Sequence, residues 1–341
     1  MTQLCRSVCF LLFLGATGCP ALAQSGYHLL GKIKIGGEGG WDYVTVDSAA
    51  RRLYVSHSTQ VEVLDVDRGT VVGKIPDTKG VHGIALAPEL NRGFTSNGRE
   101  DTVTIFDLKT LAVVGSAKTG KNPDAILYDA ASRRVFTFNG GSRDATAIEA
   151  ASGTVAGTVE LGGRPEFAVA DGEGTVYVNL EDKSTVVALD SRKLAVKTRW
   201  PLAPCEDPSS MAMDKKNGRL FIGCRNRLMA VVDSQSGKVL ATLPIGQGVD
   251  ATVFDPETAL VFNSNGDGTI TVVQEDSPDK FHGVENVVTQ RGARTIALDA
   301  KTHKLFLPVA EYGPPPAATP EQPRLRPSIV PDTFTILVVG R

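Results

Sequence analysis

Polar and charged residues recur along this chain at a regular spacing, and their types could do chemistry. The seven positions are Asp42, His82, Asp124, Glu166, Ser209, Asp250 and Arg294. From position 42 to position 294 they span 252 residues in six steps, a mean period of 42. Carboxylate, imidazole and guanidinium groups bind polar ligands, and carboxylates beside a histidine also suit a divalent cation. This chemistry requires a fold that brings the seven positions together.

The same spacing marks a repeat of strands. Copies begin at residues 41, 81, 122, 164, 207, 248 and 292. Apolar residues alternate at period two, as in Val44 and Val46, which predicts β-strands, and no segment has a sustained helical period. Turns rich in Asp and Gly, such as 65–69 and 233–237, separate the third and fourth strands. Four antiparallel strands repeating at this length are typical of a propeller blade.

The two ends of the chain predict how the ring closes. The seventh copy supplies three strands, the last one starting at Thr333. A fourth strand is available at the other end, from Tyr27 to Ile35. Pairing the two removes open sheet edges, which favour aggregation. We therefore predict an all-β, seven-bladed β-propeller, closed in its last blade by the N-terminal strand, as a single domain over residues 24–341.

The second strands carry an aromatic residue followed three positions later by Asn, in degenerate form. The clearest copies are YVSH at 54–57, FTSN at 94–97, FTFN at 136–139 and FNSN at 262–265. This pattern resembles the YVTN repeat of the bacterial YncE-like seven-bladed propellers, over the chain from about Tyr27 to Arg341. The resemblance implies an exported protein that binds or scaffolds more often than it catalyses. Leu180, Cys224 and Val309 stand where the pattern has Asn.

In a propeller the first strand of every blade lines the central channel. The seven spaced residues should therefore form a collar at one mouth of the channel. A second set, from the ends of the second strands, is expected on the same face: His57, Asn97, Asn139, Leu180, Cys224, Asn265 and Val309. Three interpretations stay open for the collar. It is a solvated polar rim, a site for a small molecule or a protein, or a catalytic metal centre.

The expected ligand-binding residues are Trp41, Asp42, His57, His82, Asp124, Glu166, Asp250 and Arg294. If a cation binds, Asp42, Asp124 and Asp250 are the expected ligands. Carboxylate and Asn oxygens suit Ca²⁺ or Mg²⁺, whereas His57 or His82 would favour Zn²⁺ or Mn²⁺. Six-bladed lactonase propellers hold a metal in the channel, so a metal-assisted hydrolase is the alternative to a binding module, by fold-level analogy. The sequence assigns no catalytic residue and requires no cofactor.

Residues 1–23 have the layout of a secretory signal peptide. Arg6 is followed by an apolar run over 8–14 and by Ala21-Leu22-Ala23, an A-x-A cleavage pattern. The run is too short for a permanent membrane span, which takes roughly 20 apolar residues. We expect cleavage after Ala23 and a periplasmic or secreted protein. A loose lipobox ending at Cys19 makes a lipoprotein the lesser alternative.

Cleavage would leave two of the five cysteines, Cys205 and Cys224, in an oxidising compartment. Cys205 precedes the first strand of the fifth copy, and Cys224 ends its second strand. Both are therefore expected on the mouth face of one blade, where they can form a disulfide. The alternative is two separate buried thiols.

The charge balance bears on the choice of partner. The chain has 36 Lys and Arg against 38 Asp and Glu, a formal charge of −2. This argues against nucleic acid and anionic lipid, which require clustered basic residues. No stretch after the signal peptide is apolar enough to cross a membrane. The expected partner is a small molecule or an envelope protein at the channel mouth, and the chain is expected to be a monomer.

A Pro-rich insertion, residues 313–331, separates the second and third strands of the last copy. It carries Arg324 and Arg326 and should emerge on the mouth face. It could fold over the acidic collar, present a polyproline stretch to a partner, or remain an exposed loop.

Overall fold

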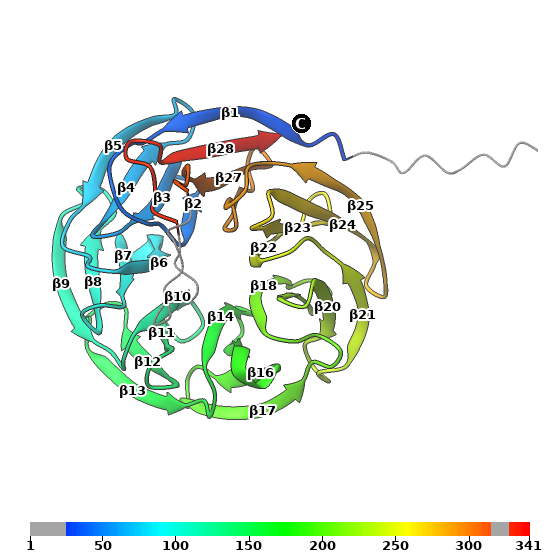
Figure 1. The fold of residues 1–341 in the computed structure, drawn as a ribbon. Helices are drawn as coiled ribbons and strands as arrows, with labels where there is room; N and C mark the ends of the chain where they lie inside the picture. Colours follow the sequence, from blue (N-terminus) through cyan, green and yellow to red (C-terminus); the bar gives the residue numbers. More distant parts are fainter. Residues whose placement is uncertain (1–24, 315–326) are drawn as a thin grey trace, which may run out of the picture.

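The computed structural model describes residues 25–314 and 327–341 of the chain. Seven four-stranded antiparallel sheets surround a central axis (Figure 1). The all-β, seven-bladed propeller predicted from the repeat is therefore confirmed. Within the described part, the only helical segments are two 3-10 turns, Pro88–Leu90 and Glu181–Lys183. The predicted signal peptide and residues 315–326 of the Pro-rich insertion lie outside the described residues.

Each blade is given by its strands in order from the channel to the rim. Blade 1 is β2 (Val44–Asp47), β3 (Arg52–His57), β4 (Gln60–Asp65) and β5 (Thr70–Ile75). Blade 2 is β6 (Val81–Ala87), β7 (Arg92–Asn97), β8 (Thr102–Asp107) and β9 (Val113–Lys118). Blade 3 is β10 (Pro123–Asp129), β11 (Arg134–Asn139), β12 (Asp144–Glu149) and β13 (Val155–Glu160). Blade 4 is β14 (Pro165–Ala170), β15 (Thr175–Leu180), β16 (Thr185–Asp190) and β17 (Ala195–Pro201).

The remaining blades follow the same order. Blade 5 is β18 (Pro208–Asp214), β19 (Arg219–Cys224), β20 (Leu228–Asp233) and β21 (Val239–Pro244). Blade 6 is β22 (Val249–Asp255), β23 (Leu260–Asn265), β24 (Thr269–Ser277) and β25 (Lys280–Val288). Blade 7 is β26 (Ala297–Asp299), β27 (Lys304–Val309), β28 (Thr335–Gly340) and β1 (His28–Lys34).

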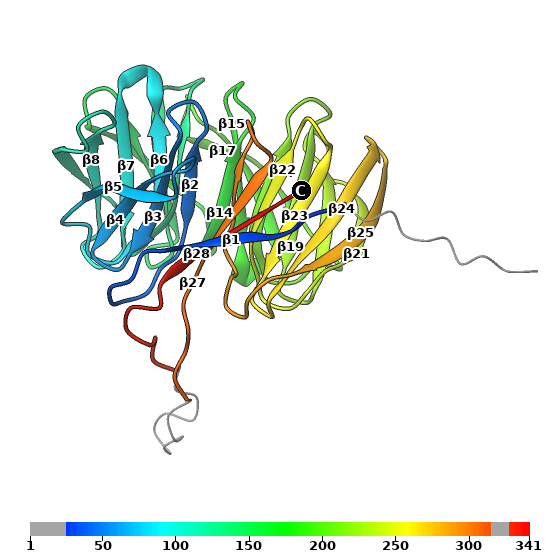
Figure 2. The same cartoon turned by 90° about the horizontal axis from the view of Figure 1, so that it is seen from above.

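Blade 7 joins the two ends of the chain. Strand β1 pairs antiparallel with β28, from His28 opposite Gly340 to Lys34 opposite Thr335. Figure 1 and Figure 2 show these two strands side by side at the rim. The predicted closure by the N-terminal strand is confirmed.

Packing between blades explains the aromatic position of the repeat. The second strands are buried along nearly their whole length because a neighbouring blade covers each face of the sheet. The aromatic side chains near their starts are almost completely buried: Tyr54, Phe94, Phe136, Tyr177, Phe221, Phe262 and Phe306. Large buried rings at one repeated position fill the wedge between adjacent sheets.

The outer strand of every blade contains a one-residue β-bulge. At this point the register with the third strand skips one residue, as at Val72 in β5 and Val114 in β9. The skipped residues in the other blades are Ala156, Lys197, Leu240, Val284 and Leu30. A bulge increases the local twist of an edge strand and makes it a poor template for pairing with another chain.

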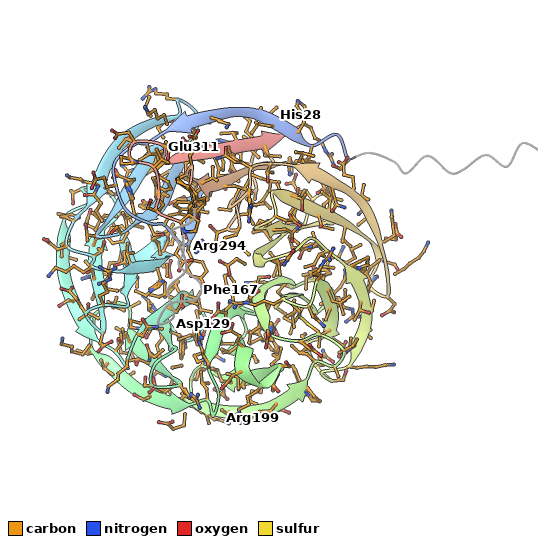
Figure 3. The ribbon with its side chains drawn as sticks, viewed as in Figure 1. His28, Asp129, Phe167, Arg199, Arg294 and Glu311 are labelled. Carbon is orange, nitrogen blue, oxygen red and sulfur yellow. A yellow bond between two sulfur atoms is a disulfide. The ribbon has the colours of Figure 1, made fainter. Side chains whose placement is uncertain are left out.

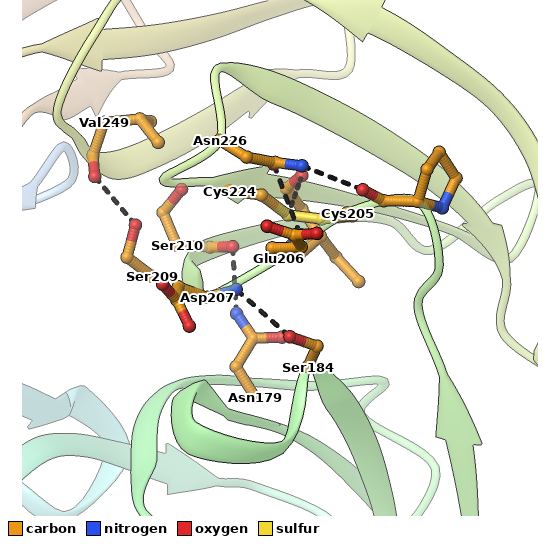
Figure 4. Close-up of a disulfide and its surroundings, with 12 residues drawn as sticks. Asn179, Ser184, Cys205, Glu206, Asp207, Ser209, Ser210, Cys224, Asn226 and Val249 are labelled. Atoms are coloured by element: carbon orange, nitrogen blue, oxygen red, sulfur yellow. Dashed lines mark hydrogen bonds between the residues drawn. A yellow bond between two sulfur atoms is a disulfide. The ribbon is translucent and has the colours of Figure 1, made fainter.

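A disulfide joins Cys205 to Cys224, with the two Cα atoms 5.8 Å apart, as predicted from the sequence. Figure 4 shows the bridge at the start of blade 5 beside Asn226. The Asn226 side chain donates to the carbonyl oxygen of Pro204 at 2.8 Å and accepts from the amide of Glu206 at 3.2 Å. Both neighbours of Cys205 are thus tied to the same loop that follows Cys224.

The disulfide gives the first prediction. Replacing both Cys205 and Cys224 by Ser should lower the free energy of unfolding by about 3 kcal/mol, because the bridge closes a loop of about 20 residues in the unfolded chain. The measurement is urea denaturation of protein lacking residues 1–23. The same protein, denatured without reductant, should show no free thiol in a colorimetric thiol assay. Two titratable thiols would contradict the bridge.

Candidate functional site

The collar residues lie at one end of the channel, where the first strands begin. The second residue of β6, β10, β14, β18 and β22 is the collar residue of each blade, and Asp42 and Arg294 precede β2 and β26. Contacts between blades connect five of them in the order Asp250, Arg294, Asp42, His82 and Asp124. The sequence spacing therefore does bring these groups together.

On blades 1 to 3, one histidine lies between two carboxylates. His82 Nδ1 is 2.6 Å from Asp42 Oδ2 and 3.6 Å from Asp124 Oδ1. One ligand atom from each of the three residues lies within 4.8 Å of the others. This is a donor set that suits Zn²⁺ or Mn²⁺.

On blades 6 and 7 the guanidinium of Arg294 lies between two other acids. Its Nε donates to Asp250 Oδ2, and its Nη2 lies 3.4 Å from Asp42 Oδ1. Asp250 is thus paired with an arginine, whereas the sequence placed it among the metal ligands. The three residues whose ligand atoms lie close enough together to share a cation are Asp42, His82 and Asp124.

On blades 4 and 5, Glu166 belongs to a second charged cluster. Arg225 lies 3.6 Å from Glu166 and 3.0 Å from Glu181, and Arg164 lies 4.0 Å and 3.4 Å from the same two carboxylates. Glu166 is only 8% exposed, and its Oε2 has no hydrogen-bond partner among the described residues. Ser209 turns away from this cluster and donates to the carbonyl oxygen of Val249 at 2.7 Å.

An aromatic contact lies below the collar. The rings of Tyr43, next to Asp42 in blade 1, and Phe167, in β14 of blade 4, have centroids 5.5 Å apart. Figure 3 shows Phe167 and Arg294 close to the centre of the ring. Because blades 1 and 4 are not neighbours, this contact crosses the channel. The two rings also line a cavity of about 110 Å³, whose walls include Ile84 and Val253. The collar is therefore the rim of a shallow pocket with an aromatic floor.

The second predicted set belongs to the interior of the blades. Asn97, Asn139 and Asn265 are fully buried and hydrogen-bond to threonines within their own blades. His57 is 4% exposed, with its ring 4.5 Å from that of Phe334 and Nδ1 3.5 Å from Glu62. These side chains are packed against the faces of the sheets, inside the ring of blades, and do not line the channel. The same holds for Leu180, Cys224 and Val309, which are buried.

Trp41 is likewise buried against other side chains. It is 7% exposed and stacks on Phe334 with ring centroids 5.3 Å apart. It also lies 6.1 Å from the ring of Tyr312, where the Pro-rich insertion begins. Figure 2 shows the described flanks of the insertion leaving one face of the wheel. Because β27 ends there, this is the collar face.

Several site residues were not singled out from the sequence. Tyr43 and Phe167 directly follow the collar positions Asp42 and Glu166, which was a usable signal, because the next residue of a first strand also lies near the channel. Glu181 and Arg225 directly follow the ends of second strands. Nothing in the local sequence indicates that these two residues of different blades meet.

Burial and crowding of acids shift the pKa values of the collar upward. Burial raises the pKa of Asp124 to about 7, and the charges of Asp42 and Asp250 add to this against the opposing effect of His82. Burial also raises the pKa of Glu166 to about 9, together with the charges of Asp124 and Glu181. Burial is the main cause that raises the pKa of Asp250 as well.

Burial has the opposite effect on the pKa of the histidine. Burial lowers the pKa of His82, but the hydrogen bond with Asp42 and the charge of Asp124 raise it more. Its pKa therefore lies above the ordinary value. In sum, the collar holds more acidic groups than cations, and burial keeps part of those acids protonated at neutral pH.

The raised pKa of Glu166 gives the second prediction. A carboxyl whose pKa is raised on folding stabilises the protein below its ordinary pKa, and that stability is lost as pH rises toward 9. Glu166→Gln does not ionise, so it should match the wild type near pH 5 and be more stable at pH 8 by on the order of 1 kcal/mol. Urea denaturation at several pH values measures this. Glu38→Gln, at an exposed glutamate, is the control, and parallel pH profiles for Glu166→Gln and wild type would contradict the prediction.

Comparison with known proteins finds structural likeness without sequence likeness. No protein-family model matches the chain, and no curated protein matches it. A chain in the crystal structure of the mitotic checkpoint complex aligns over 99% of both chains, with a TM-score of 0.75 and 11% identity. The structure of U3-55K aligns with 90% of this chain and 97% of its own, with a TM-score of 0.73 and 10% identity.

The WD40 repeats of RRP9 align with 91% of this chain and 97% of their own, with a TM-score of 0.74 and 10% identity. The shared feature is the fold. Identities this low carry no activity or partner from one protein to another. No helix in residues 25–314 or 327–341 has the length and hydropathy needed to cross a membrane.

Proposed function

We propose that this protein is an exported binding module of the YncE-like propeller class, which holds a positively charged group of a small ligand or an envelope protein at the collar. The fold supports the module, and the second-strand pattern with the signal-peptide layout supports the class and the export. The charge of the collar supports the site.

The observation that carries the proposal is the uncompensated Glu166. It is 8% exposed, its Oε2 has no hydrogen-bond partner among the described residues, and its two nearest guanidinium groups lie 3.6 and 4.0 Å away. Buried polar atoms in folded proteins normally have a hydrogen-bond partner, so an exception calls for a partner from water, an ion or a ligand. A donor group from a ligand would satisfy this atom.

The charge count gives the ligand its sign. The collar and its adjoining cluster contain the five carboxylates of Asp42, Asp124, Glu166, Glu181 and Asp250. Three guanidinium groups face them, from Arg164, Arg225 and Arg294. Burial keeps Glu166 and part of Asp124 protonated at neutral pH, and a bound cation would favour their ionised forms. An ammonium group placed above the aromatic floor would gain from the charges and from Tyr43 and Phe167.

Spermidine is a suitable probe of this site, and the experiment is the third prediction. Calorimetric titration at pH 8 and low salt should show saturable binding to protein lacking residues 1–23. The double variant Asp124→Asn, Glu166→Gln should bind at least tenfold more weakly, because it removes two of the five acidic groups that would ionise around the bound cation. Added salt should weaken binding to the wild type.

Two controls separate the collar from general acidity. Glu38→Gln, at an exposed glutamate outside the collar, should bind spermidine like the wild type. A circular-dichroism melt of the double variant establishes that it folds. Absence of saturable binding to the wild type, or equal binding to the double variant, would refute the proposed site.

A metal-assisted hydrolase of lactonase type is the second candidate, favoured by the grouping of Asp42, His82 and Asp124. In such an enzyme a metal ion would activate a water molecule for attack on a lactone carbonyl. The three residues supply two carboxylates and an imidazole, and three protein ligands with an open position are typical of catalytic zinc. Arg294 would hold Asp42 in place through its second carboxylate oxygen.

The fourth prediction separates this candidate from the binding module. Titration with Zn²⁺ and Mn²⁺ should give binding heat that Asp124→Ala abolishes and Asp250→Ala largely retains, because Asp250 lies on Arg294 and outside the grouped ligands. Turnover of a lactone panel by the metal-loaded protein would support the hydrolase. Absence of binding heat removes the metal site, and metal binding without turnover removes the enzyme.

A further inference from the structure

A groove lies between blades 4 and 5, at the end of the wheel opposite to the collar. Its volume is about 610 Å³, and its walls include the turns after β14, β18 and β20 and part of β17. First strands begin at the collar, so the turns that follow first and third strands lie at the other end. Ligand pockets for small molecules typically have volumes of about 300–1,000 Å³. The groove is thus of suitable size and is separate from the collar.

The register of the repeat shows what is particular to this groove. Lys197 is the residue skipped at the bulge of β17. The equivalent residue in the six other blades is apolar, as at Val72 and Val114 in β5 and β9. A lysine is therefore not needed for the bulge. Its side chain is exposed, and it lines the groove with Nζ 3.0 Å from Thr175 Oγ1.

The same strand contains a second residue that differs from its equivalents in the other blades. Trp200 stands opposite Val186, at the position occupied by Ile75, Ala117, Val159, Leu243 and Val287 in other blades. It is partly exposed to the groove and packs between the ring of Tyr177, 6.0 Å away, and Gly237. Both faces of the indole are covered, so a ligand would meet its edge.

The third difference from the other blades lies in a turn of blade 5. The four-residue turn between β18 and β19 begins with Lys215-Lys216, and both side chains are exposed in the groove wall. The matching turns of other blades begin with Ser48-Ala49, Pro88-Glu89, Ala130-Ala131, Pro256-Glu257 and Ala300-Lys301. No other matching turn places two lysines there.

Two of the three acids in the groove wall already have partners within the protein. Asp171 accepts three backbone N–H groups of its own turn, and Asp233 is paired with Arg219 at 2.7 Å. Within the described residues, Lys197, Lys215 and Lys216 have no carboxylate within ion-pair distance. Glu173 is the remaining acid of the wall. The wall therefore holds four cations against three acids, an excess of one positive charge on a protein whose net charge is −2: Lys197, Lys215, Lys216 and Arg219 against Asp171, Glu173 and Asp233.

We propose that this groove is a second binding site, specific for a small anion with two or more acidic groups. Lys215 and Lys216 would contact one end of the ligand and Lys197 the other, with the edge of Trp200 between them. A compact ammonium group binds phosphate and carboxylate oxygens as a point charge, so the lysines set the sign of the ligand more than its identity. The site does not depend on the function proposed for the collar.

The fifth prediction tests this groove with pyrophosphate and citrate, which share the charge but differ in the acidic group. Each is titrated into protein lacking residues 1–23 in a buffer free of EDTA. Calorimetry and tryptophan fluorescence follow the binding. The chain has two tryptophans, and Trp41 is 7% exposed, so a change on binding reports mainly Trp200. At least one probe should bind saturably and change the fluorescence. The stronger probe identifies the acidic group that the groove prefers.

Lysine variants then locate the binding. The double variant Lys215→Gln, Lys216→Gln should bind the stronger probe at least tenfold more weakly than the wild type. The matched control is Lys301→Gln, which removes the lysine at the position of Lys216 in blade 7 and should bind like the wild type. Glu166→Gln should also bind normally, which separates the groove from the collar. The proposal is overturned if neither probe binds the wild type, or if Lys301→Gln weakens binding as much as the double variant.

Discussion

The pairing of β1 with β28 is the constraint on which the rest of the structure depends. Every other blade is continuous in sequence, so its four strands meet through short turns at little entropic cost. Blade 7 instead joins residues about 300 positions apart, from His28 to Gly340. Once that ladder forms, all seven first strands have fixed places around the axis. The collar exists only because the last of them, before β26, is brought next to the first, before β2, where Arg294 meets Asp42.

The sequence was sufficient for the architecture because the repeat is redundant. Seven copies of the same pattern predict the strands, the number of blades and the missing strand supplied by residues 27–35, and the structure agrees on each. The collar also followed from the repeat, because a fixed period places one residue per blade at the same height in the channel. Asp42, His82, Asp124, Asp250 and Arg294 are in contact for this reason.

What the repeat could not predict is where side chains point and which of them meet. His57 and Asn97 share their strand end with the collar face, yet their side chains turn into the blade, because alternation along a strand decides the side. The pairing of Asp250 with Arg294 and the contact of Tyr43 with Phe167 join residues of different blades through the geometry of the ring. The bulge at Lys197 depends on register, which short apolar strands leave open.

The aromatic contact between Tyr43 and Phe167 has a consequence for how a ligand could move along the central channel. Two rings that meet across the axis narrow the channel between the collar and the opposite face. A ligand at the proposed collar site would therefore exchange most directly with solvent on the collar face. The proposed groove opens at the opposite end of the wheel. The two proposed sites would therefore not compete for space, and one disc would hold two ligands of opposite sign apart by its own thickness.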